Sequence, residues 1–169
     1  MKGSELRLIE YMEGSKKRFI IPVYQRNYDW KIENCKQLYD DLIQVIKNNS
    51  KTHFFGSIVS VYEPSGRNTE FLIIDGQQRL TTMSLLFLAM YNLLEEKIII
   101  SEDESLKDQI YEDFLVDKYQ PQEKRMKLKP IKNDQKAFSK LFNSKDDYIK
   151  DSNLTINYIC LFDYLFISS

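Results

Sequence analysis

The sequence has few of the residues that build metal centres and disulfide frameworks. Histidine occurs once, at His53, which excludes zinc and metal-nuclease sites that need several histidines. The two cysteines, Cys35 and Cys160, are far apart and fall on apolar faces of predicted helices. That placement favours reduced, buried thiols and a cytoplasmic protein over a disulfide framework.

An excess of charge of one sign and a long apolar run are also missing. Lysine and arginine number 24 against 25 aspartates and glutamates, and the net charge is -1. Nucleic acid would therefore have to contact a local basic patch. The longest apolar run, 85–91, is far shorter than the ~20 residues that span a bilayer. Residues 1–13 are mixed and charged, unlike a signal peptide, so no membrane contact is expected.

Hydrophobic periodicity predicts an α+β protein. With 43% apolar and 29% charged residues, the 169 residues suit one globular domain with a substantial core. Ser4 is the expected cap of a short first helix, and Asp29 and Asn133 or Asp134 are expected caps of later ones. Two strands are expected to form an antiparallel hairpin around a turn at 64–68. Helices are expected over 32–46, 78–95, 102–115, 134–142 and 154–167, and strands over 19–21, 53–62, 70–74 and 124–130.

One stretch, Phe71–Thr82, organises the rest of the chain. An apolar run ends abruptly at Asp75-Gly76, polar residues follow, and a long apolar segment continues to Leu94. This pattern predicts a buried strand, a tight turn at Gly76 and a buried helix whose first turn is polar. Free backbone N–H groups and the fork of Arg79 would then point to one place, which suits a phosphate.

Three residues of this turn have distinct candidate roles. Arg79 would hold phosphate oxygens in a bidentate manner, or else pair with Asp75 to stabilise the turn. Asp75 is the best carboxylate for a metal ion or for positioning a water, and its structural alternative is to cap the helix. Gly76 would supply a backbone conformation or a close approach that a side chain forbids.

The amides and hydroxyls that follow have two interpretations each. Gln77 and Gln78 would orient a water or contact a base, or else form a solvated first helical turn. Thr81 or Thr82 would contact a phosphate or a phosphate-bound magnesium ion, or else return a hydrogen bond to the helix backbone.

Other candidate residues lie outside this turn. Arg26 is a candidate second phosphate ligand, and Tyr24, Tyr28 and Trp30 would stack on a base, although core packing is favoured for Tyr28 and Trp30. His53 is usable as a general base or phosphate donor, or is structural. The basic segment 124–132 is either an edge that faces DNA or a charged edge that prevents aggregation. No Walker loop and no Ser-His-Asp or Cys-His arrangement is present.

Three motifs together resemble a known family. They are Pro22–Trp30 (PVYQRNYDW), His53–Val59 (HFFGSIV) and Ile74–Thr82 (IDGQQRLTT). Their order and spacing resemble the N-terminal domain of GmrSD-type restriction proteins, a ParB/sulfiredoxin-like group. The likeness runs from about Ser4 to the end of the sequence.

The resemblance implies a fold and a function. The family has a small mixed β-sheet surrounded by α-helices, and its Asp-Gly-Gln-Gln-Arg motif is associated with nucleotide binding and hydrolysis. The Tyr24-Gln25-Arg26 segment is similar to the first motif of ParB-like proteins, which lies against the same nucleotide site. The segment from His53 to Gly56 would be a third element of that site. Members commonly continue into a nuclease domain of the His-Asn-His type and act against phage or modified DNA.

The resemblance also implies a domain organisation. Residues 1–169 would form a single ParB-like nucleotide-binding domain, with the motifs in 1–100 and a helical extension over 101–169. We expect the sequence to stop before a C-terminal nuclease domain. The expected ligands are a nucleoside triphosphate and magnesium. The expected partners are that nuclease domain or a partner subunit, with DNA contacted through the longer protein.

Three functions remain open at the level of sequence. The first is a nucleotide-binding domain that hydrolyses NTP and regulates a modification-dependent restriction or phage-defence protein. In this hypothesis Arg79 and Arg26 clamp phosphates, Asp75 holds a metal ion or water, and Gln77 and Gln78 orient the nucleophile. The second is a sensor of DNA or nucleotide without turnover. The third is a ParB-like nuclease, which is disfavoured because no cluster of metal-binding carboxylates is visible.

Overall fold

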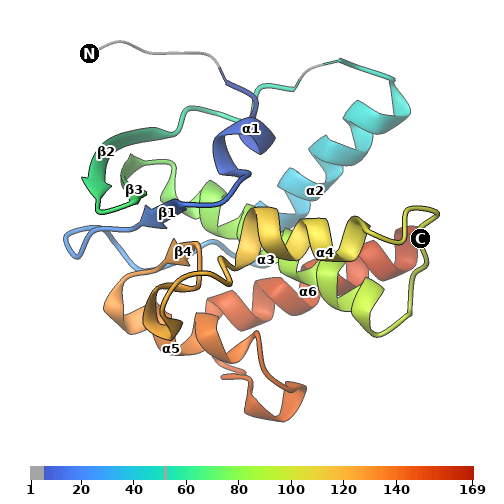
Figure 1. The fold of residues 1–169 in the computed structure, drawn as a ribbon. Coiled ribbons are helices and arrows are strands. Elements are labelled where there is room, and N and C mark those ends of the chain that lie inside the picture. The colour runs from blue at the N-terminus through green and yellow to red at the C-terminus, as the bar shows by residue number, and fades with distance from the viewer. Residues whose placement is uncertain (1–5, 52) are drawn as a thin grey trace.

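A computed structural model describes residues 6–51 and 53–169, in which a small sheet lies beside a group of helices (Figure 1). The predicted α+β class is confirmed. The helices are α1 (Leu8–Met12), α2 (Ile32–Lys47), α3 (Gln77–Glu95), α4 (Leu106–Ile110), α5 (Lys132–Lys140) and α6 (Asn153–Ser168). The strands are β1 (Lys17–Ile20), β2 (Val59–Ser65), β3 (Asn68–Asp75) and β4 (Leu128–Lys129).

The sheet is mixed, in the order β2-β3-β1-β4. The predicted hairpin is confirmed, because β2 pairs antiparallel with β3. Strand β1 lies parallel to both of its neighbours, with Phe19 opposite Phe71 on β3 and Leu128 on β4. The carboxyl ends of β3, β1 and β4 therefore lie at one edge of the sheet, the kind of edge where ligands bind in open sheets with parallel strands.

Helix α3 runs through the middle of the molecule, packed against α4 and α6 (Figure 1). Leu80, Leu85 and Leu88 on this helix are at most 1% exposed. The prediction that α3 is apolar and covered on nearly every side is confirmed. Buried side chains from Met12 in α1 to Leu161 in α6 form one core, so packing crosses the expected boundary at residue 100.

The expected strand over 53–62 begins only at Val59. Gly56, at φ +91°, interrupts an extended conformation, and 53–58 crosses toward the start of α3 instead of joining the sheet. The expected turn at 64–68 is shorter, because Pro64 pairs with Thr69 and Ser65 pairs with Asn68.

The expected basic strand over 124–130 is reduced to the two residues of β4. Lys127 is 1% exposed, and its Nζ donates to the carbonyl oxygens of Met12, Gly14 and Asp113. The prediction that the alternating basic residues form one basic face is therefore wrong. A 3-10 turn at Gln122–Lys124 replaces the start of the expected strand.

Several expected helix boundaries also differ. The helix predicted over 102–115 begins at Leu106 as α4 and continues as a π-helical turn over Tyr111–Leu115. Asp29 and Asp134 cap no helix, because α2 begins after Lys31 and α5 begins after Ile131. The expected cap Ser4 lies outside the described residues.

Both cysteines are free thiols, with Cys35 buried and Cys160 half-buried. Within the described part of the chain, no helix has the length and apolar character needed to cross a membrane.

Candidate functional site

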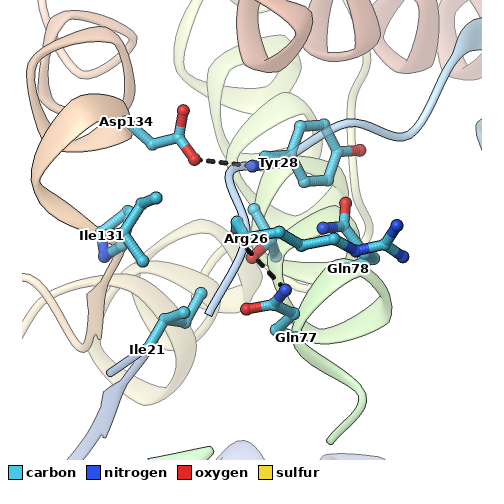
Figure 2. Close-up of a pocket in the computed structure, with 9 residues that line it drawn as sticks. Ile21, Arg26, Tyr28, Gln77, Gln78, Ile131 and Asp134 are labelled. Atoms are coloured by element: carbon cyan, nitrogen blue, oxygen red, sulfur yellow. Dashed lines mark hydrogen bonds between the residues drawn. The ribbon is translucent and has the colours of Figure 1, made fainter. Parts of the chain in front are cut away.

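Three chain segments meet where the parallel strands end. Residues 21–30 follow β1, residues 76–82 follow β3, and residues 130–134 follow β4. They enclose a hollow of about 210 Å³, a volume that includes space open to solvent (Figure 2). It is lined by Ile21, Arg26, Tyr28, Gln77, Gln78, Thr81, Pro130, Ile131 and Asp134.

The turn between β3 and α3 requires the glycine at position 76. Gly76 is the N-cap of α3 at φ +87°, and a Cβ there would lie 2.9 Å from the Ser57 carbonyl oxygen. The Gly76 N–H donates to Oδ1 of Asp75 at 2.7 Å. Asp75 therefore holds the turn through this backbone contact, and its side chain is otherwise exposed.

The amino end of α3 has no side-chain cap and no acidic residue in its first turn. The Leu80 N–H donates to the Gly76 carbonyl oxygen at 3.0 Å. The N–H groups of residues 77–79 have no side-chain acceptor in the described part of the chain. The positive end of the helix dipole thus remains available to an anion.

Arg79 lies over the crossing segment 53–58. Its Nη2 donates to the Ser57 carbonyl oxygen at 2.7 Å, and a Cβ on Gly56 would lie 2.3 Å from Nη1. Within residues 6–51 and 53–169, Arg79 has no ion pair with a carboxylate, so the alternative of an Arg79–Asp75 pair is wrong. The guanidinium is a half-buried positive charge with no counter-charge among these residues.

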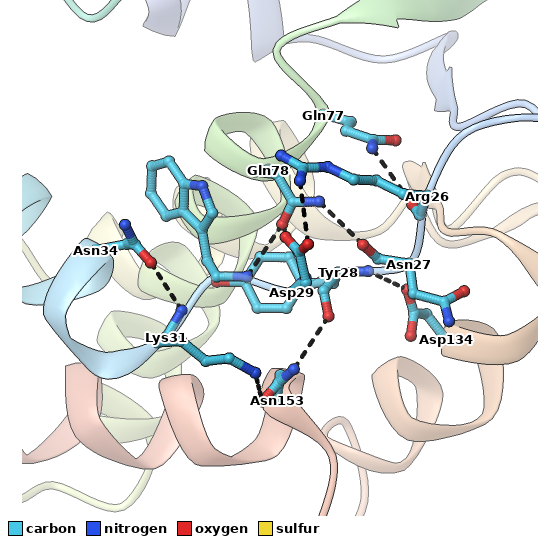
Figure 3. A network of polar contacts seen from close by, with 11 residues as sticks. Arg26, Asn27, Tyr28, Asp29, Lys31, Asn34, Gln77, Gln78, Asp134 and Asn153 are labelled. Atoms are coloured by element: carbon cyan, nitrogen blue, oxygen red, sulfur yellow. Dashed lines mark hydrogen bonds and ion pairs between the residues drawn. The ribbon is translucent and has the colours of Figure 1, made fainter.

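Gln78 connects the start of α3 to the loop after β1 through hydrogen bonds (Figure 3). Its Nε2 donates to the Asn27 carbonyl oxygen at 3.0 Å, and its Oε1 accepts from the N–H groups of Asp29 and Trp30 at 3.1 and 3.3 Å. These contacts occupy the amide oxygen completely.

Gln77 makes a single loop contact. Its Nε2 donates to the Arg26 carbonyl oxygen at 3.3 Å, while its Oε1 is buried without a hydrogen-bond partner among the described residues. Gln77 and Gln78 are 7% and 6% exposed, so the alternative of a solvated first helical turn is wrong for both.

Tyr28 and Thr82 belong to a buried polar cluster under the loop. The two hydroxyls lie 2.7 Å apart, and Asn157 on α6 donates to the Tyr28 oxygen at 3.1 Å. Burial raises the pKa of Tyr28 well above its usual range. Thr82 also donates to the Gln78 carbonyl oxygen at 2.8 Å, which is the hydrogen bond to the helix backbone expected as its structural alternative. Core packing of Tyr28 is confirmed, whereas Thr81 lines the hollow.

The remaining predicted residues lie at the rim or farther away. Gln25 donates to the Ile74 carbonyl oxygen at 2.9 Å, and Tyr24 is 70% exposed. The exposed Arg26 pairs with Asp29 at 3.1 Å. His53 lies at the start of the crossing segment, where its Nε2 is 3.8 Å from a carboxylate oxygen of Asp41 on α2.

Asp134 is a residue of the hollow that sequence reasoning missed. Its Oδ2 accepts from the Tyr28 N–H at 2.7 Å, and burial raises the pKa of its carboxyl group. Its local pattern indicated only a helix cap, since its approach to Tyr28 spans 106 residues. Among the described residues, no group of three or more His, Cys, Asp or Glu side chains is placed to hold a metal ion.

The comparisons with known proteins give one family. The model of the family described as GmrSD restriction endonuclease, N-terminal domain, matches residues 8–165, nearly the whole chain. No curated protein matches the chain.

Proposed function

The chain belongs to the GmrSD restriction endonuclease N-terminal domain family, and from this membership we propose that it binds a nucleoside triphosphate at the start of α3. Hydrolysis of that nucleotide would regulate a modification-dependent restriction or phage-defence protein. The family places the chain among restriction proteins, and the nucleotide is our proposal.

The observation that carries the proposal is the group of positive donors at the carboxyl edge of β3, where Asp75 is the neighbouring carboxylate. The 19-residue helix α3 begins at Gly76 without a side-chain cap, and the guanidinium of Arg79, which forms no ion pair in the described part of the chain, contacts Ser57, the residue that also lies against Gly76. A phosphate group supplies the acceptor oxygens and the negative charge that both lack. Gly56 lets the guanidinium of Arg79 lie against the backbone, and Gly76 lets Ser57 and Ile58 lie against the start of α3, so the two glycines hold these donors beside the crossing segment.

Arg26 and Tyr24 would complete the site from the rim. The ion pair of Arg26 with Asp29 is exposed on both sides, and such pairs are worth little, so Arg26 is free to turn toward a phosphate. Tyr24 presents an exposed ring on which a base would stack.

Asp75 is the residue suited to magnesium or to the attacking water. It is exposed at the end of β3, and its Oδ2 has no hydrogen bond to the described residues. Magnesium is commonly held by one or two carboxylates together with substrate phosphates, which fits a single carboxylate here. When bound, the ion would neutralise phosphate charge. The amides of Gln77 and Gln78 face the loop, so we assign them to positioning that loop.

The proposal is tested by measuring nucleotide binding and phosphate release for the wild type, Arg79→Ala and Arg79→Lys. Arg67→Ala, in the exposed β2–β3 turn, is the matched control. We expect Arg79→Ala to weaken binding roughly 10-fold to 100-fold, because charged hydrogen bonds to the phosphate are lost. Arg79→Lys should recover part of the affinity, and the control should bind as the wild type does.

Other outcomes separate the alternatives. A wild-type protein that is folded by circular dichroism but binds no nucleotide would contradict the proposal. Binding without phosphate release would favour a sensor, an alternative supported by the occupied amide of Gln78 and the single exposed carboxylate of Asp75. DNA cleavage that is lost in Asp75→Ala would favour the nuclease.

A further inference from the structure

A row of lysines follows one side of α5. Lys132, Lys136 and Lys140 recur at every fourth position of this helix, so neighbours in the row are separated by a rise of about 6 Å. Phe138, on the opposite side, is buried in the core. Lys129 precedes the helix on β4, the last strand in the order of the sheet, and is also exposed (Figure 1). We call these four lysines the α5 row.

The α5 row has little to neutralise it. Lys129, Lys132 and Lys136 are exposed and form no ion pair with a carboxylate in the described part of the chain. The Nζ of Lys140 lies 3.8 Å from a carboxylate oxygen of Asp147, which is itself exposed. Exposed pairs of this kind are worth little. The row therefore concentrates positive charge in a chain whose net charge is -1.

The α5 row also departs from two local rules of helix stability. Lys132 is the first residue of α5, where the positive end of the helix dipole disfavours a cation, and like charges four residues apart destabilise a helix. The acid of this first turn, Asp134, accepts from the Tyr28 N–H. On α2, by contrast, Lys36 has Asp40 as its partner four residues on. Departures from local stability are expected where a surface has a function.

The surroundings of the row indicate a partner with many negative charges. Within residues 128–140 no large apolar side chain is exposed, and a helix that lies on a membrane needs an apolar face to insert. Lysine ammonium groups bind phosphates as point charges. Duplex DNA carries one negative charge per about 1.7 Å of its axis, so lysines that follow one another at about 6 Å would each find a phosphate within reach.

We propose that the α5 row contacts the phosphate backbone of duplex DNA without regard to its sequence. Phosphate contacts fix the position of a protein on the duplex and carry no sequence information. The chain belongs to a restriction endonuclease family, and DNA is the polyanion on which such enzymes act. Pro130 and Ile131, which follow Lys129, line the hollow together with Arg26, so DNA on the row would pass beside the proposed nucleotide site. The inference goes beyond nucleotide binding and does not require it.

The test is fluorescence anisotropy with a labelled duplex of about 20 base pairs, titrated without nucleotide at salt concentrations between about 50 and 200 mM. We expect Lys132→Gln/Lys136→Gln to weaken binding roughly 10-fold to 100-fold at the lowest salt, and to reduce the slope of log affinity against log salt by about two. Lys129→Gln alone should reduce the slope by about one. The matched control, Lys47→Gln/Arg67→Gln, removes the same charge from exposed positions on α2 and in the β2–β3 turn and should keep the slope.

Several outcomes would overturn the inference. A folded wild type that binds no duplex at the lowest salt would do so, as would an equal loss of slope in the control, which would show an effect of net charge alone. Strong dependence on the sequence of the duplex would mean that base contacts elsewhere carry the binding. Binding to vesicles of anionic lipid but not to DNA would assign the row to a membrane. Circular dichroism verifies the fold of each variant, and the Lys129→Gln comparison stands even where the double variant fails to fold. Triphosphate binding is measured separately, so this inference and the proposed function can fail independently.

Discussion

At the residue scale, two features of Gly76 disfavour a side chain, its positive φ of +87° and its close contact with the backbone of Ser57. Gly66 has a similar positive φ of +64°, but a Cβ there would meet no atom within 4 Å, so it isolates the conformational effect. We expect Gly76→Ala to lower the free energy of unfolding by roughly 2–4 kcal/mol, because left-handed strain adds to a clash with Ser57 and Ile58. Gly66→Ala should cost only about 1–2 kcal/mol. Urea denaturation measures both, and equal losses would contradict the role of the close contact.

A second prediction at this scale concerns Lys127 and the pH dependence of stability. Burial lowers the pKa of Lys127 to about 8, while the carbonyl oxygens of Met12, Gly14 and Asp113 surround its Nζ. Between about pH 8 and the usual lysine pKa of about 10.4, the unfolded chain holds a proton that the folded chain has released. Stability should therefore rise with pH across this window, by at most about 1.4 kcal/mol per pH unit from this group.

The measurement for Lys127 is the free energy of unfolding between pH 7 and 10, for the wild type and Lys127→Met. The variant should lose this pH dependence, and at pH 7 it should be less stable by roughly 1–3 kcal/mol because buried carbonyls lose their donor. Lys129→Met, an exposed neighbour on β4, is the control and should keep the wild-type profile. Parallel profiles for the wild type and Lys127→Met would show that Lys127 does not titrate in this window.

At the element scale, the loop after β1 owes its shape to α3. Gln78→Met keeps the length of the side chain and removes its three loop contacts. We expect a loss of roughly 1–3 kcal/mol in stability and faster hydrogen exchange at the Asp29 and Trp30 amides, whose acceptor is gone. Gln37→Met, on the exposed face of α2, is the control. Unchanged exchange at Asp29 and Trp30 would contradict this role of Gln78.

The elements that could be predicted are those with a strong local pattern. The helices α2, α3 and α6 begin and end within one residue of the expected positions, because their apolar residues recur over many turns. The prediction of a strand over 53–58 is wrong, since its aromatic residues favour strands but its path is set by contacts with Arg79 and Gly76. The burial of Lys127 could not be predicted for a similar reason. Basic and apolar residues alternate around it, a local pattern that is typical of an exposed lysine.

At the scale of the whole molecule, the site could be predicted only in part. The turn Asp75–Arg79 has a local signature, an apolar run broken by Asp-Gly, and it could be located from sequence alone. The approach of Asp134 could not, because parallel pairing of β1 with β3 and β4 joins residues about 50 and 110 positions apart without a local signal. The role of α6 could not be predicted either, because its contacts with the loop join residues far apart in the sequence. Asn153 and Asn157 donate to the carbonyl oxygens of Tyr28 and Trp30.

The motif-bearing part of the chain therefore depends on its last helix. Leu154, Tyr158 and Leu161 on α6 are at most 2% exposed, and truncating each such side chain costs roughly 2–5 kcal/mol. Their joint loss rivals the roughly 5–15 kcal/mol that stabilises an ordinary domain. We expect a fragment of residues 1–152 to lose cooperative thermal unfolding and nucleotide binding, although every residue of the three motifs is present.

The matched control for this truncation is residues 1–165, which keeps the buried side chains of α6 and the Tyr39 contact with the Tyr164 carbonyl oxygen. It loses only the exposed Phe166 and Ile167 and the Tyr39–Ser168 hydrogen bond, so it should melt close to the full chain. Circular dichroism melting and calorimetric titration of the three chains test the expectation. A folded, nucleotide-binding 1–152 fragment would mean that the buried contacts of α6 are dispensable. The site would then depend on residues 1–100 in the way that the positions of the motifs alone suggest.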